Sequence, residues 1–474
     1  MSQTFFFYDL ETSGLSARSD RIMQFAGQRT SMDLKPIGEP FNILVKLSDD
    51  TLPSPEAVMV TGITPQSTQM DGLTEAEFAD LLLKEVFTPD TITVGFNSVR
   101  FDDEFIRHLF WRTFRDPYEW CWKDGCSRWD MLDVIRMTRA LRPEGIEWPV
   151  DEQGKPTNRL ELITKANGIV HESAHDALSD VEALIDVTRL LRSAQPKLFE
   201  YLLATRTKKA VQSLVNLERK QPFVYTSGRY DAAHDKTTVA FPLTSAPNGN
   251  VVVYDLRHDP NQFVGLTTEQ MHEKLFAPWE VRRSEEFVPL PVKIMQYNRC
   301  PAVAPVGVLE QADGWSNINL SLELVELNKQ TLLQHPDFAE KIRSLFEDRP
   351  DFAISHDSES RLYEGFIDGS DKVRIEAVRN ADAAKLADFH PEFQDERLSD
   401  LLLRYKARNY PSSLTEREAE EWEAWRRNRL ESQLPAFVAS LQKLSRTNLT
   451  DSQRFLLEEL QLWAEAIMPA PDDF

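Results

Sequence analysis

Hydrophobic and polar positions divide the chain into three stretches with different periodicities. Residues 1 to about 193 alternate strand-like runs, such as 5–11 and 91–97, with amphipathic helical stretches, a pattern typical of an α/β domain with a mixed sheet. From about 200 to 345 the apolar runs become short and are punctuated by Asn, Gly and Pro, which predicts a small barrel-like or sandwich β domain with helical insertions. Beyond about 350, apolar residues recur at helical spacing. We therefore expect three domains, over residues 1–195, 196–347 and 348–474.

Length and composition fit this division. A chain of 474 residues is too long for one compact core, and 41% apolar with 27% charged residues is ordinary for a soluble globular protein. No stretch of about eighteen apolar residues occurs, which argues against a membrane span, and the short apolar run at the N-terminus is unlike a signal peptide. The three cysteines, at 121, 126 and 300, lack the spacing of a zinc site and suit a reducing compartment. We expect a cytoplasmic protein.

The net charge of −22 does not by itself exclude a nucleic-acid partner. Phosphate contacts need only a local basic groove, and acidic residues on other faces aid solubility. One segment reverses the sign of the chain, and its charged residues are Arg206, Lys208, Lys209, Arg219, Lys220, Arg229 and Lys236 against Glu218, Asp231 and Asp235. This basic segment is either a solvated face or a surface that contacts DNA, and the sequence does not distinguish the two.

The first strand-like run ends in two carboxylates. Asp9 and Glu11 are two residues apart, so their side chains point to the same face of a strand. Two carboxylates this close repel each other unless a cation neutralises them, and oxygen ligands suit Mg²⁺ or Mn²⁺. Alone, the pair is weak evidence, because the same spacing occurs by chance in many surface strands.

Another carboxylate opens the apolar face of a helix that we predict to begin near Asp102. The residues that share this face at helical spacing are Asp102, Phe105, Ile106 and Leu109. A carboxylate in this position needs a partner. Asp103 is rotated by about 100° and can pair with Arg107, so we expect it to be a solvated surface group. The alternative is that Asp102 only caps the helix.

A similar pattern recurs in the segment 172–191. The predicted apolar face consists of Asp180, Leu184, Val187 and Leu191. His175 lies five residues before Asp180 and cannot share that face, so we expect it in the preceding loop, where it can lean over the same site. We expect Asp176 to cap the helix. A lone histidine of this kind is more often structural than catalytic, but its proximity to carboxylates favours the catalytic reading.

Together these segments resemble the motifs of the DEDD exonuclease superfamily, in its histidine-containing branch. Further runs resemble the bacterial exonuclease I family, and they cover residues 60–66, 127–145, 159–169 and 401–411. The similarity therefore extends over nearly the whole chain, although it is thinner from about 230 to 340. The resemblance implies a multidomain fold: a ribonuclease H-like α/β domain with a mixed sheet and helices, an SH3-like β domain and a C-terminal helical domain.

The same resemblance implies a function and a set of roles. It implies a processive, monomeric 3′→5′ exonuclease that degrades single-stranded DNA to 5′-mononucleotides in DNA repair and recombination. Asp9, Glu11 and Asp180 would hold one Mg²⁺ ion. Asp9 and Asp102 would support a second, and Mn²⁺ could substitute for either. His175 would be the general base that takes a proton from the attacking water, a task that suits an imidazole with a pKa of about 6.5.

Residues near these motifs are candidates for contacts with the DNA or with a partner protein. A narrow channel with aromatic and basic side chains would favour a single strand, and the candidates for lining it are Arg100, Phe101, Arg128 and Trp148. At Arg142 and Tyr201 the resemblance implies a receptor for the acidic C-terminal tail of single-stranded-DNA-binding protein. The alternative is that these aromatics are core residues and that the arginine is an ordinary surface group.

Two other functions fit parts of the pattern. An RNA-trimming nuclease of the same superfamily would consist essentially of the first domain, so the residues beyond 195 argue against it. A non-catalytic module that binds single strands would have no need to keep all five residues of the motifs, which are Asp9, Glu11, Asp102, His175 and Asp180.

Overall fold

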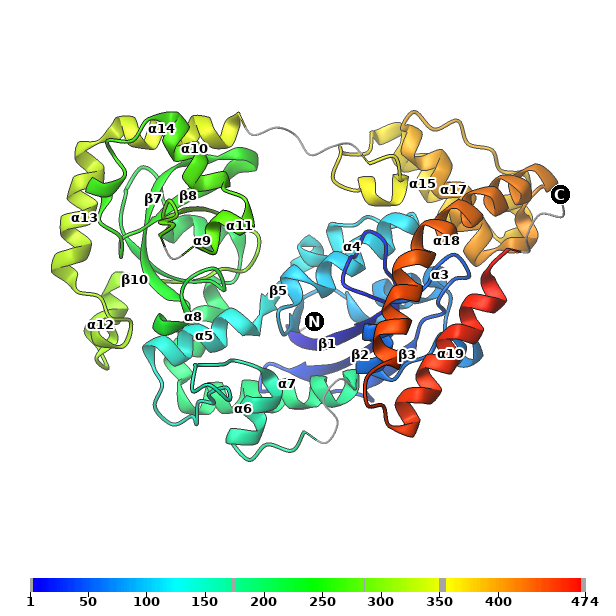
Figure 1. The fold of residues 1–474 in the computed structure, drawn as a ribbon, viewed down its shortest axis with the longest axis horizontal. Helices are drawn as coiled ribbons and strands as arrows, with labels where there is room; N and C mark the ends of the chain where they lie inside the picture. Colours follow the sequence, from blue (N-terminus) through cyan, green and yellow to red (C-terminus); the bar gives the residue numbers. More distant parts are fainter. Residues whose placement is uncertain (1–2, 172–175, 285, 349–354, 470–474) are drawn as a thin grey trace. The chain divides into compact units, whose positions relative to one another are not determined.

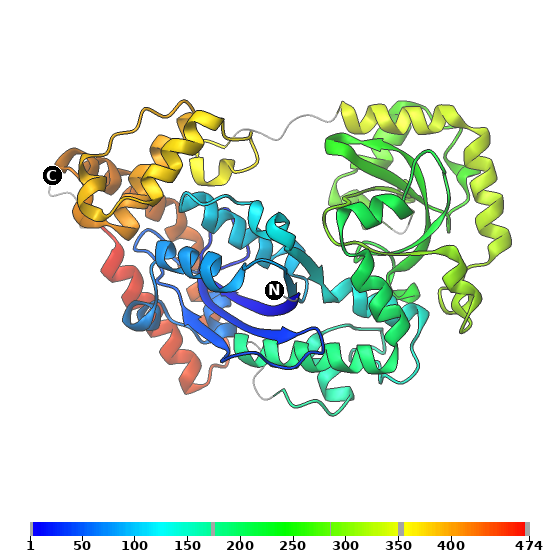
Figure 2. The same ribbon diagram turned by 180° about the vertical axis from the view of Figure 1, so that it is seen from behind.

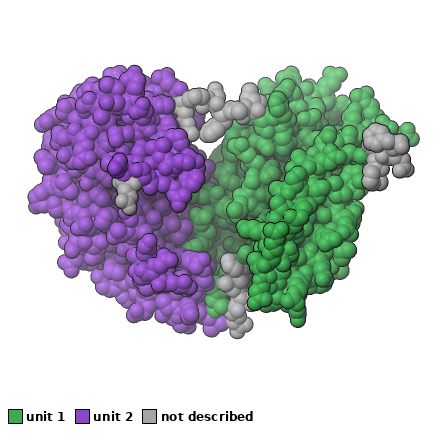
Figure 3. Space-filling model, viewed as in Figure 1, with its two compact units in different colours: residues 1–127, 171–184, 353–474 green, residues 128–170, 185–352 purple. Residues whose placement is uncertain are grey.

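The computed structural model describes residues 3–171, 176–284, 286–348 and 355–469. The chain forms two compact units, coloured green and purple in Figure 3. Unit 1 comprises residues 1–127, 171–184 and 353–474, and unit 2 comprises residues 128–170 and 185–352. No helix in the described part of the chain is both long and apolar enough to cross a membrane.

A five-stranded sheet with the order β3-β2-β1-β4-β5 is the framework of unit 1 (Figure 1). Its strands are β1 (Thr4–Thr12), β2 (Ile22–Ser31), β3 (Phe41–Leu44), β4 (Thr91–Gly95) and β5 (Ser127–Asp130), within which the chain passes into unit 2. β1 pairs antiparallel with β2 and parallel with β4. The sheet is therefore mixed, as the sequence predicts.

Helices of unit 1 come from both ends of the chain. Those from the first part are α1 (Pro55–Thr61), α2 (Pro65–Asp71), α3 (Glu75–Leu81) and α4 (Asp102–Arg112). Those from the last part are α15 (Gly369–Arg379), α16 (Ala383–Asp388), α17 (Glu396–Asn409), α18 (Glu416–Ser445) and α19 (Asp451–Ile467). α7 (Ala177–Ala194) begins in unit 1 and continues into unit 2.

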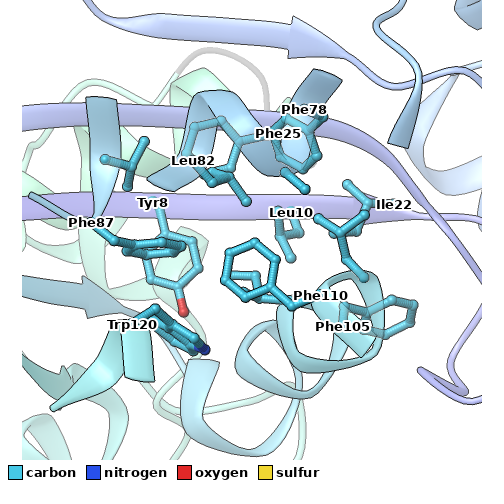
Figure 4. Close-up of a cluster of buried hydrophobic side chains, with 14 of the residues drawn as sticks. Tyr8, Leu10, Ile22, Phe25, Phe78, Leu82, Phe87, Phe105, Phe110 and Trp120 are labelled. Carbon is cyan, nitrogen blue, oxygen red and sulfur yellow. The ribbon is translucent and has the colours of Figure 1, made fainter. Parts of the chain in front are cut away.

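The alternation of side chains along β1 separates the core of unit 1 from its candidate site. Phe6, Tyr8 and Leu10 point into a buried cluster that includes Phe105 and Phe110 of α4 (Figure 4). Burying such side chains contributes roughly 1.5–3 kcal/mol each. The alternate residues of β1 point to the other face of the strand.

Gly27 shows how tightly this core is packed. It lies opposite Tyr8 on β2, and a Cβ atom at this position would lie 2.4 Å from the ring of Phe6. Only glycine fits here without a shift of the core.

The long C-terminal helices pack on the same unit. Leu430 and Phe437 of α18 and Leu460 of α19 share a buried cluster with Met23 of β2 and Val58 of α1. Figures 1 and 2 show α18 and α19 as neighbouring orange and red helices. Residues more than 400 positions apart thus form one core.

Unit 2 is built on an antiparallel five-stranded sheet with the order β10-β6-β7-β8-β9. Its strands are β6 (Phe223–Thr226), β7 (Thr237–Ala246), β8 (Asn250–Asp255), β9 (Val292–Met295) and β10 (Ala302–Pro305). Its helices are α5 (Met131–Leu141), α6 (Leu160–Ala166), α8 (Pro196–Thr205), α9 (Lys208–Leu214), α10 (Thr268–Phe276), α11 (Trp279–Arg282), α12 (Gly314–Asn317), α13 (Leu322–Gln334) and α14 (Pro336–Glu347). The predicted β domain with helical insertions is present.

Candidate active site

Three predicted carboxylates converge at the end of β1. Asp9 and Glu11 lie on the face of β1 that is turned away from the aromatic core, and Asp180 lies in the first turn of α7. One ligand atom of each carboxylate lies within 4.8 Å of the others. A register shift follows Glu11, where the pairing of β1 with β2 becomes irregular. The structure therefore brings together residues that are about 170 positions apart.

The electrostatics of this group fit a divalent cation. Burial, and then the charge of Asp180, raise the pKa of the Asp9 carboxyl well above its usual range. Burial, and then the charges of Asp9 and Asp180, raise the pKa of Glu11 to about 9. Crowded carboxylates of this kind are relieved by a positive ion, and their hard oxygen atoms suit Mg²⁺ or Mn²⁺.

The start of α7 is fixed by a cap, as predicted. The backbone N–H of Ser179 donates to Oδ1 of Asp176 at 3.0 Å, and the backbone N–H of Asp180 donates to the Asp176 carbonyl at 2.9 Å. These bonds set the position of the first helical turn, and with it that of Asp180. His175 lies outside the described residues, so its role as a base stays a prediction.

A histidine that the sequence analysis missed contacts Asp180. Nε2 of His171 lies 2.6 Å from Oδ1 of Asp180, and the His171 side chain is only 5% exposed. An ionised carboxylate can only accept a hydrogen bond, so Nε2 donates when Asp180 is charged. A signal for this contact exists in the sequence, because His171 stands nine residues before Asp180, shortly before the predicted helix.

Asp102 is the first residue of α4, and its predicted apolar face is confirmed. Asp102, Phe105, Ile106 and Leu109 are all buried. Asp102 does not belong to the group formed by Asp9, Glu11 and Asp180, which is the group of close carboxylates found among the described residues. The charge of Asp102 contributes to a raised pKa of Tyr8, after burial and the charge of Asp103.

The prediction that Asp103 is a solvated surface group is wrong. Asp103 is 1% exposed and accepts a 2.5 Å hydrogen bond from the hydroxyl of Tyr8. The predicted partner, Arg107, pairs with Glu104 at 3.1 Å. The predicted rotation of Asp103 away from the apolar face of α4 does not bring it into solvent. α4 lies against β1, so the side of the helix that carries Asp103 faces Tyr8.

Behind the turn that follows Glu11 lies a buried ion cluster. Its members are Arg21, Asp50, Glu75, Arg112, Glu359, Arg408 and Arg429. Arg21 contacts Glu359 at 2.7 Å, and both side chains are almost fully buried. Arg408 also contacts Glu359, and it contacts Asp50 at 2.9 Å. The cluster thus ties α17 and α18 to the β1–β2 turn.

Arg21 connects the ion cluster to the end of β1. The backbone N–H of Arg21 donates to the hydroxyl of Ser13 at 2.9 Å, and the N–H of Ser13 donates to the Arg21 carbonyl at 2.8 Å. Ser13 is two residues beyond Glu11. The C-terminal helices therefore support the turn that follows the site carboxylates.

The candidates for DNA contact lie in different surroundings. Arg100 is exposed, whereas the ring of Phe101 lies 5.0 Å from that of Phe105 beside the core. In unit 2, Arg128 is buried and donates to the Asn298 carbonyl at 2.6 Å. The guanidinium of Arg139 lies 5.7 Å from the ring of Trp148. Their proposed contacts stay predictions.

Arg142 and Tyr201, the candidates for binding a protein tail, are both partly buried. The Arg142 guanidinium donates to the carbonyls of Val308 at 3.0 Å and Gln311 at 3.3 Å. Burial raises the pKa of Tyr201. Arg142 is therefore held in place by neutral backbone groups, and its charge is not cancelled by them.

Family models match three consecutive parts of the chain. Residues 6–188 match an exonuclease domain, residues 206–348 match the exonuclease I SH3-like domain, and residues 356–467 match the exonuclease I C-terminal domain. These matches confirm the predicted fold class.

Curated relatives match along nearly their entire length. Exodeoxyribonuclease I of Haemophilus influenzae is 38% identical, with 96% of each chain covered. Exodeoxyribonuclease I of Escherichia coli is 36% identical, with 98% of each chain covered.

Solved structures agree with these matches. Exonuclease I from Methylocaldum szegediense superposes with a TM-score of 0.93 at 39% identity, over 98% of this chain and 100% of that one. E. coli exonuclease I in complex with a dA16 oligonucleotide superposes with a TM-score of 0.94 at 35% identity, over 98% of this chain and 100% of that one. By domain order, by sequence identity along the full chain and by structure, this chain belongs to the exonuclease I family.

Proposed function

We propose that this chain is a processive 3′→5′ exonuclease that degrades single-stranded DNA to 5′-mononucleotides with the help of divalent metal ions. We further propose that it acts as a cytoplasmic monomer in DNA repair and recombination. The observation that carries the proposal is the convergence of Asp9, Glu11 and Asp180, with ligand atoms within 4.8 Å of one another. Relatives that are named exodeoxyribonuclease I support it, as does a related structure that contains an oligonucleotide.

Asp9, Glu11 and Asp180 would hold one cation, and Asp102 with Asp9 would support a second. Mg²⁺ is the proposed ion, with Mn²⁺ as a substitute, because hard oxygen ligands favour both. When bound, two such ions supply an activated water and stabilise the leaving 3′ oxygen. A structure of E. coli exonuclease I with bound zinc and single-stranded DNA supports the use of a divalent ion.

The protein's own groups would position the substrate and move the proton. The cap at Asp176 and the contact from His171 fix the carboxylate of Asp180. His175 would accept a proton from the attacking water, so its replacement by Ala would lower the rate by about 10²- to 10⁴-fold while leaving DNA binding largely intact. Arg100, Phe101, Arg128 and Trp148 would contact the single strand.

A protein partner is also proposed. A related structure is described as a complex of SSB and exonuclease I, which supports recognition of the tail of single-stranded-DNA-binding protein by this chain. Arg142 and Tyr201 would bind the tail, and the uncancelled charge of Arg142 fits an acidic peptide. Unchanged affinity for the tail peptide in Arg142→Ala would refute this assignment.

The domain division at residues 1–195, 196–347 and 348–474 is proposed for the same chain. The bounds of the matching SH3-like and C-terminal family models, 206–348 and 356–467, support it.

The test uses three matched substrates labelled at the 5′ end: single-stranded DNA, duplex DNA and single-stranded RNA. With Mg²⁺ we expect progressive shortening of the single-stranded DNA alone, with mononucleotide products, and no reaction by Asp9→Ala. Preference for RNA would instead assign the chain to the trimming nucleases. Inactivity on all three substrates would leave only a binding module.

A further inference from the structure

The site carboxylates of β1 and α4 come from elements that no strand pairing joins at that level. Asp9 lies in β1, whereas Asp102 is the first residue of α4, which follows β4 in the chain. The parallel pairing of β1 with β4 ends at Phe7 and Val94, so Asp9 lies beyond the last of these pairs. The pairing of the two strands therefore does not by itself set the separation of Asp9 and Asp102.

The start of α4 also differs from the start of α7. A helix start is commonly fixed by a side-chain oxygen at the N-cap, which accepts a backbone hydrogen bond. Asp176 supplies such an oxygen to α7. The N-cap of α4 is Phe101, whose ring contains no oxygen. The position of the first turn of α4 therefore depends on contacts with neighbouring elements.

A close turn leads from β4 to α4 beside β1. β4 ends at Gly95, where a Cβ atom would lie 2.4 Å from Cβ of Ser98 and 3.5 Å from the carbonyl oxygen of Tyr8. Asn97 adopts a left-handed backbone with a φ of 63°, which Asn tolerates better than most residues. The chain thus turns directly beside Tyr8 before α4 begins.

A hydrogen bond joins the two elements at this point. The Tyr8 hydroxyl donates to Oδ1 of Asp103 at 2.5 Å, and both residues are 1% exposed. Tyr8 immediately precedes Asp9, and Asp103 immediately follows Asp102. The ring of Tyr8 is held in the buried cluster of Figure 4, so packing restrains its hydroxyl. A bond between the chain neighbours of two site carboxylates restrains the distance between those carboxylates.

We propose that Tyr8 and Asp103 are a positioning pair that fixes the spacing of Asp9 and Asp102, and with it the binding of a second divalent ion. The proposal rests on the proposed function, in which Asp102 with Asp9 supports that ion. The three convergent carboxylates would hold the first ion, so loss of the pair should weaken the second ion selectively. Contacts that orient metal ligands commonly affect metal affinity by about 10- to 100-fold.

Two variants remove the hydrogen bond. Tyr8→Phe keeps the aromatic ring in the core and deletes the hydroxyl. Tyr8→Phe combined with Asp103→Leu makes both partners apolar, and replacing both partners of a buried hydrogen bond in this way can be nearly neutral for stability. The double variant therefore separates positioning from folding. Asp103→Asn keeps an oxygen that accepts the hydroxyl and removes the charge, so it separates the hydrogen bond from the charge.

Tyr363→Phe is the matched control. The Tyr363 hydroxyl also donates to a carboxylate of α4, Oε2 of Glu104 at 2.5 Å, and this bond is exposed to solvent. Glu104 is the residue after Asp103 in the first turn of α4. The control therefore removes the same kind of bond from the same helical turn without changing the link to β1.

The measurement counts bound Mn²⁺ from the electron paramagnetic resonance signal of the free ion. It uses the full chain with thymidine 5′-monophosphate, the kind of product that the proposed function releases. We expect the wild type to bind two ions. Both variants without the hydrogen bond should bind the first ion with unchanged affinity and the second about 10-fold or more weakly. Asp103→Asn and Tyr363→Phe should match the wild type.

Hydrolysis supplies a second readout that a merely structural role would not move. In the two variants without the hydrogen bond, kcat should fall at low Mg²⁺ and recover at high Mg²⁺. The KM for single-stranded DNA should stay unchanged, because neither Tyr8 nor Asp103 would touch the strand.

Wild-type affinity for both ions in the double variant overturns the proposal. Equal weakening of both ions in that variant overturns it too, because the pair would then support the whole site and not the spacing. Loss of the second ion in Asp103→Asn but not in Tyr8→Phe would also contradict it, since Asp103 would then act through its charge. Failure of the proposed function is read separately: a wild type that binds two ions but hydrolyses no DNA loses the function, and the variants still test the pair.

Discussion

Nε2 of His171 lies 2.6 Å from Oδ1 of Asp180, and this contact links a loop histidine to the carboxylate that completes the candidate metal site. The bond occupies one oxygen of Asp180 and restrains rotation of the carboxylate. Hydrogen bonds that orient a metal ligand in this way commonly affect metal affinity by 10- to 100-fold.

We therefore expect His171→Ala to raise the Mg²⁺ concentration needed for half-maximal hydrolysis by about 10- to 100-fold. His171→Gln, which keeps an N–H donor of similar reach, should restore part of the affinity. The measurement is activity against Mg²⁺ concentration, with DNA binding in EDTA as a second readout that should not change. His390→Ala, at an exposed position, is the control. An unaltered Mg²⁺ requirement in His171→Ala would show that the contact does not position the ligand.

Asp9→Asn should abolish both hydrolysis and stabilisation by metal. Asp9 belongs to the group of three carboxylates, and an amide removes one anionic ligand while keeping the shape of the side chain. A metal at 100 times its dissociation constant stabilises a protein by about 2.7 kcal/mol, so Mn²⁺ should raise the melting temperature of the wild type. The variant should show no such rise, and Glu39→Gln, an exposed change of the same charge, should behave as wild type. A full metal-induced shift in Asp9→Asn would contradict the proposed ligand set.

The sequence predicted the three carboxylates that converge, but not their surroundings. Asp9 and Glu11 follow from strand alternation, and Asp180 follows from helical spacing, because both are local rules. The burial of Asp103 was missed because it depends on Tyr8, a residue 95 positions away. The contact between Arg21 and Glu359 spans 338 positions, and no periodicity along the chain reports such a pair. Long-range pairing of charges is decided by packing, so it was found only in the structure.

Glu359→Gln should destabilise the protein strongly. The change leaves Arg21 and Arg408 buried without the carboxylate that both contact. Removing one partner of a buried ion pair typically costs about 3–5 kcal/mol. The measurement is the midpoint of urea unfolding, followed by tryptophan fluorescence. The control is Asp451→Asn, which removes an exposed pair with Arg454 and should change stability by less than about 0.5 kcal/mol. Equal midpoints for the two variants would mean that the cluster contributes little to stability.

The same cluster predicts loss of stability in acid. Burial favours a high pKa for Asp50, but the guanidinium groups of Arg408, Arg429 and Arg21 outweigh it and hold that pKa below its usual range. For Glu359, burial likewise favours a high pKa, but the neighbouring arginines, Arg408 first, outweigh it. The pKa of Glu359 is therefore also held well below its usual range. A carboxyl with a lowered pKa in the folded state contributes its full stabilisation above the unfolded pKa, near 4, and loses it as the pH falls toward the folded value.

The urea midpoints of the wild type and Glu359→Gln should therefore differ by a nearly constant amount between pH 7 and about pH 5, and this difference should shrink below about pH 4. Glu359→Gln removes one of these titrating groups, so its midpoint should begin lower and decline less steeply over the same range. The experiment compares both proteins at closely spaced pH values and fixed ionic strength, because salt screens the exposed pairs. Parallel declines in the two proteins would assign the acid sensitivity to carboxylates other than Glu359. A steeper decline in the variant would contradict the sign of the linkage.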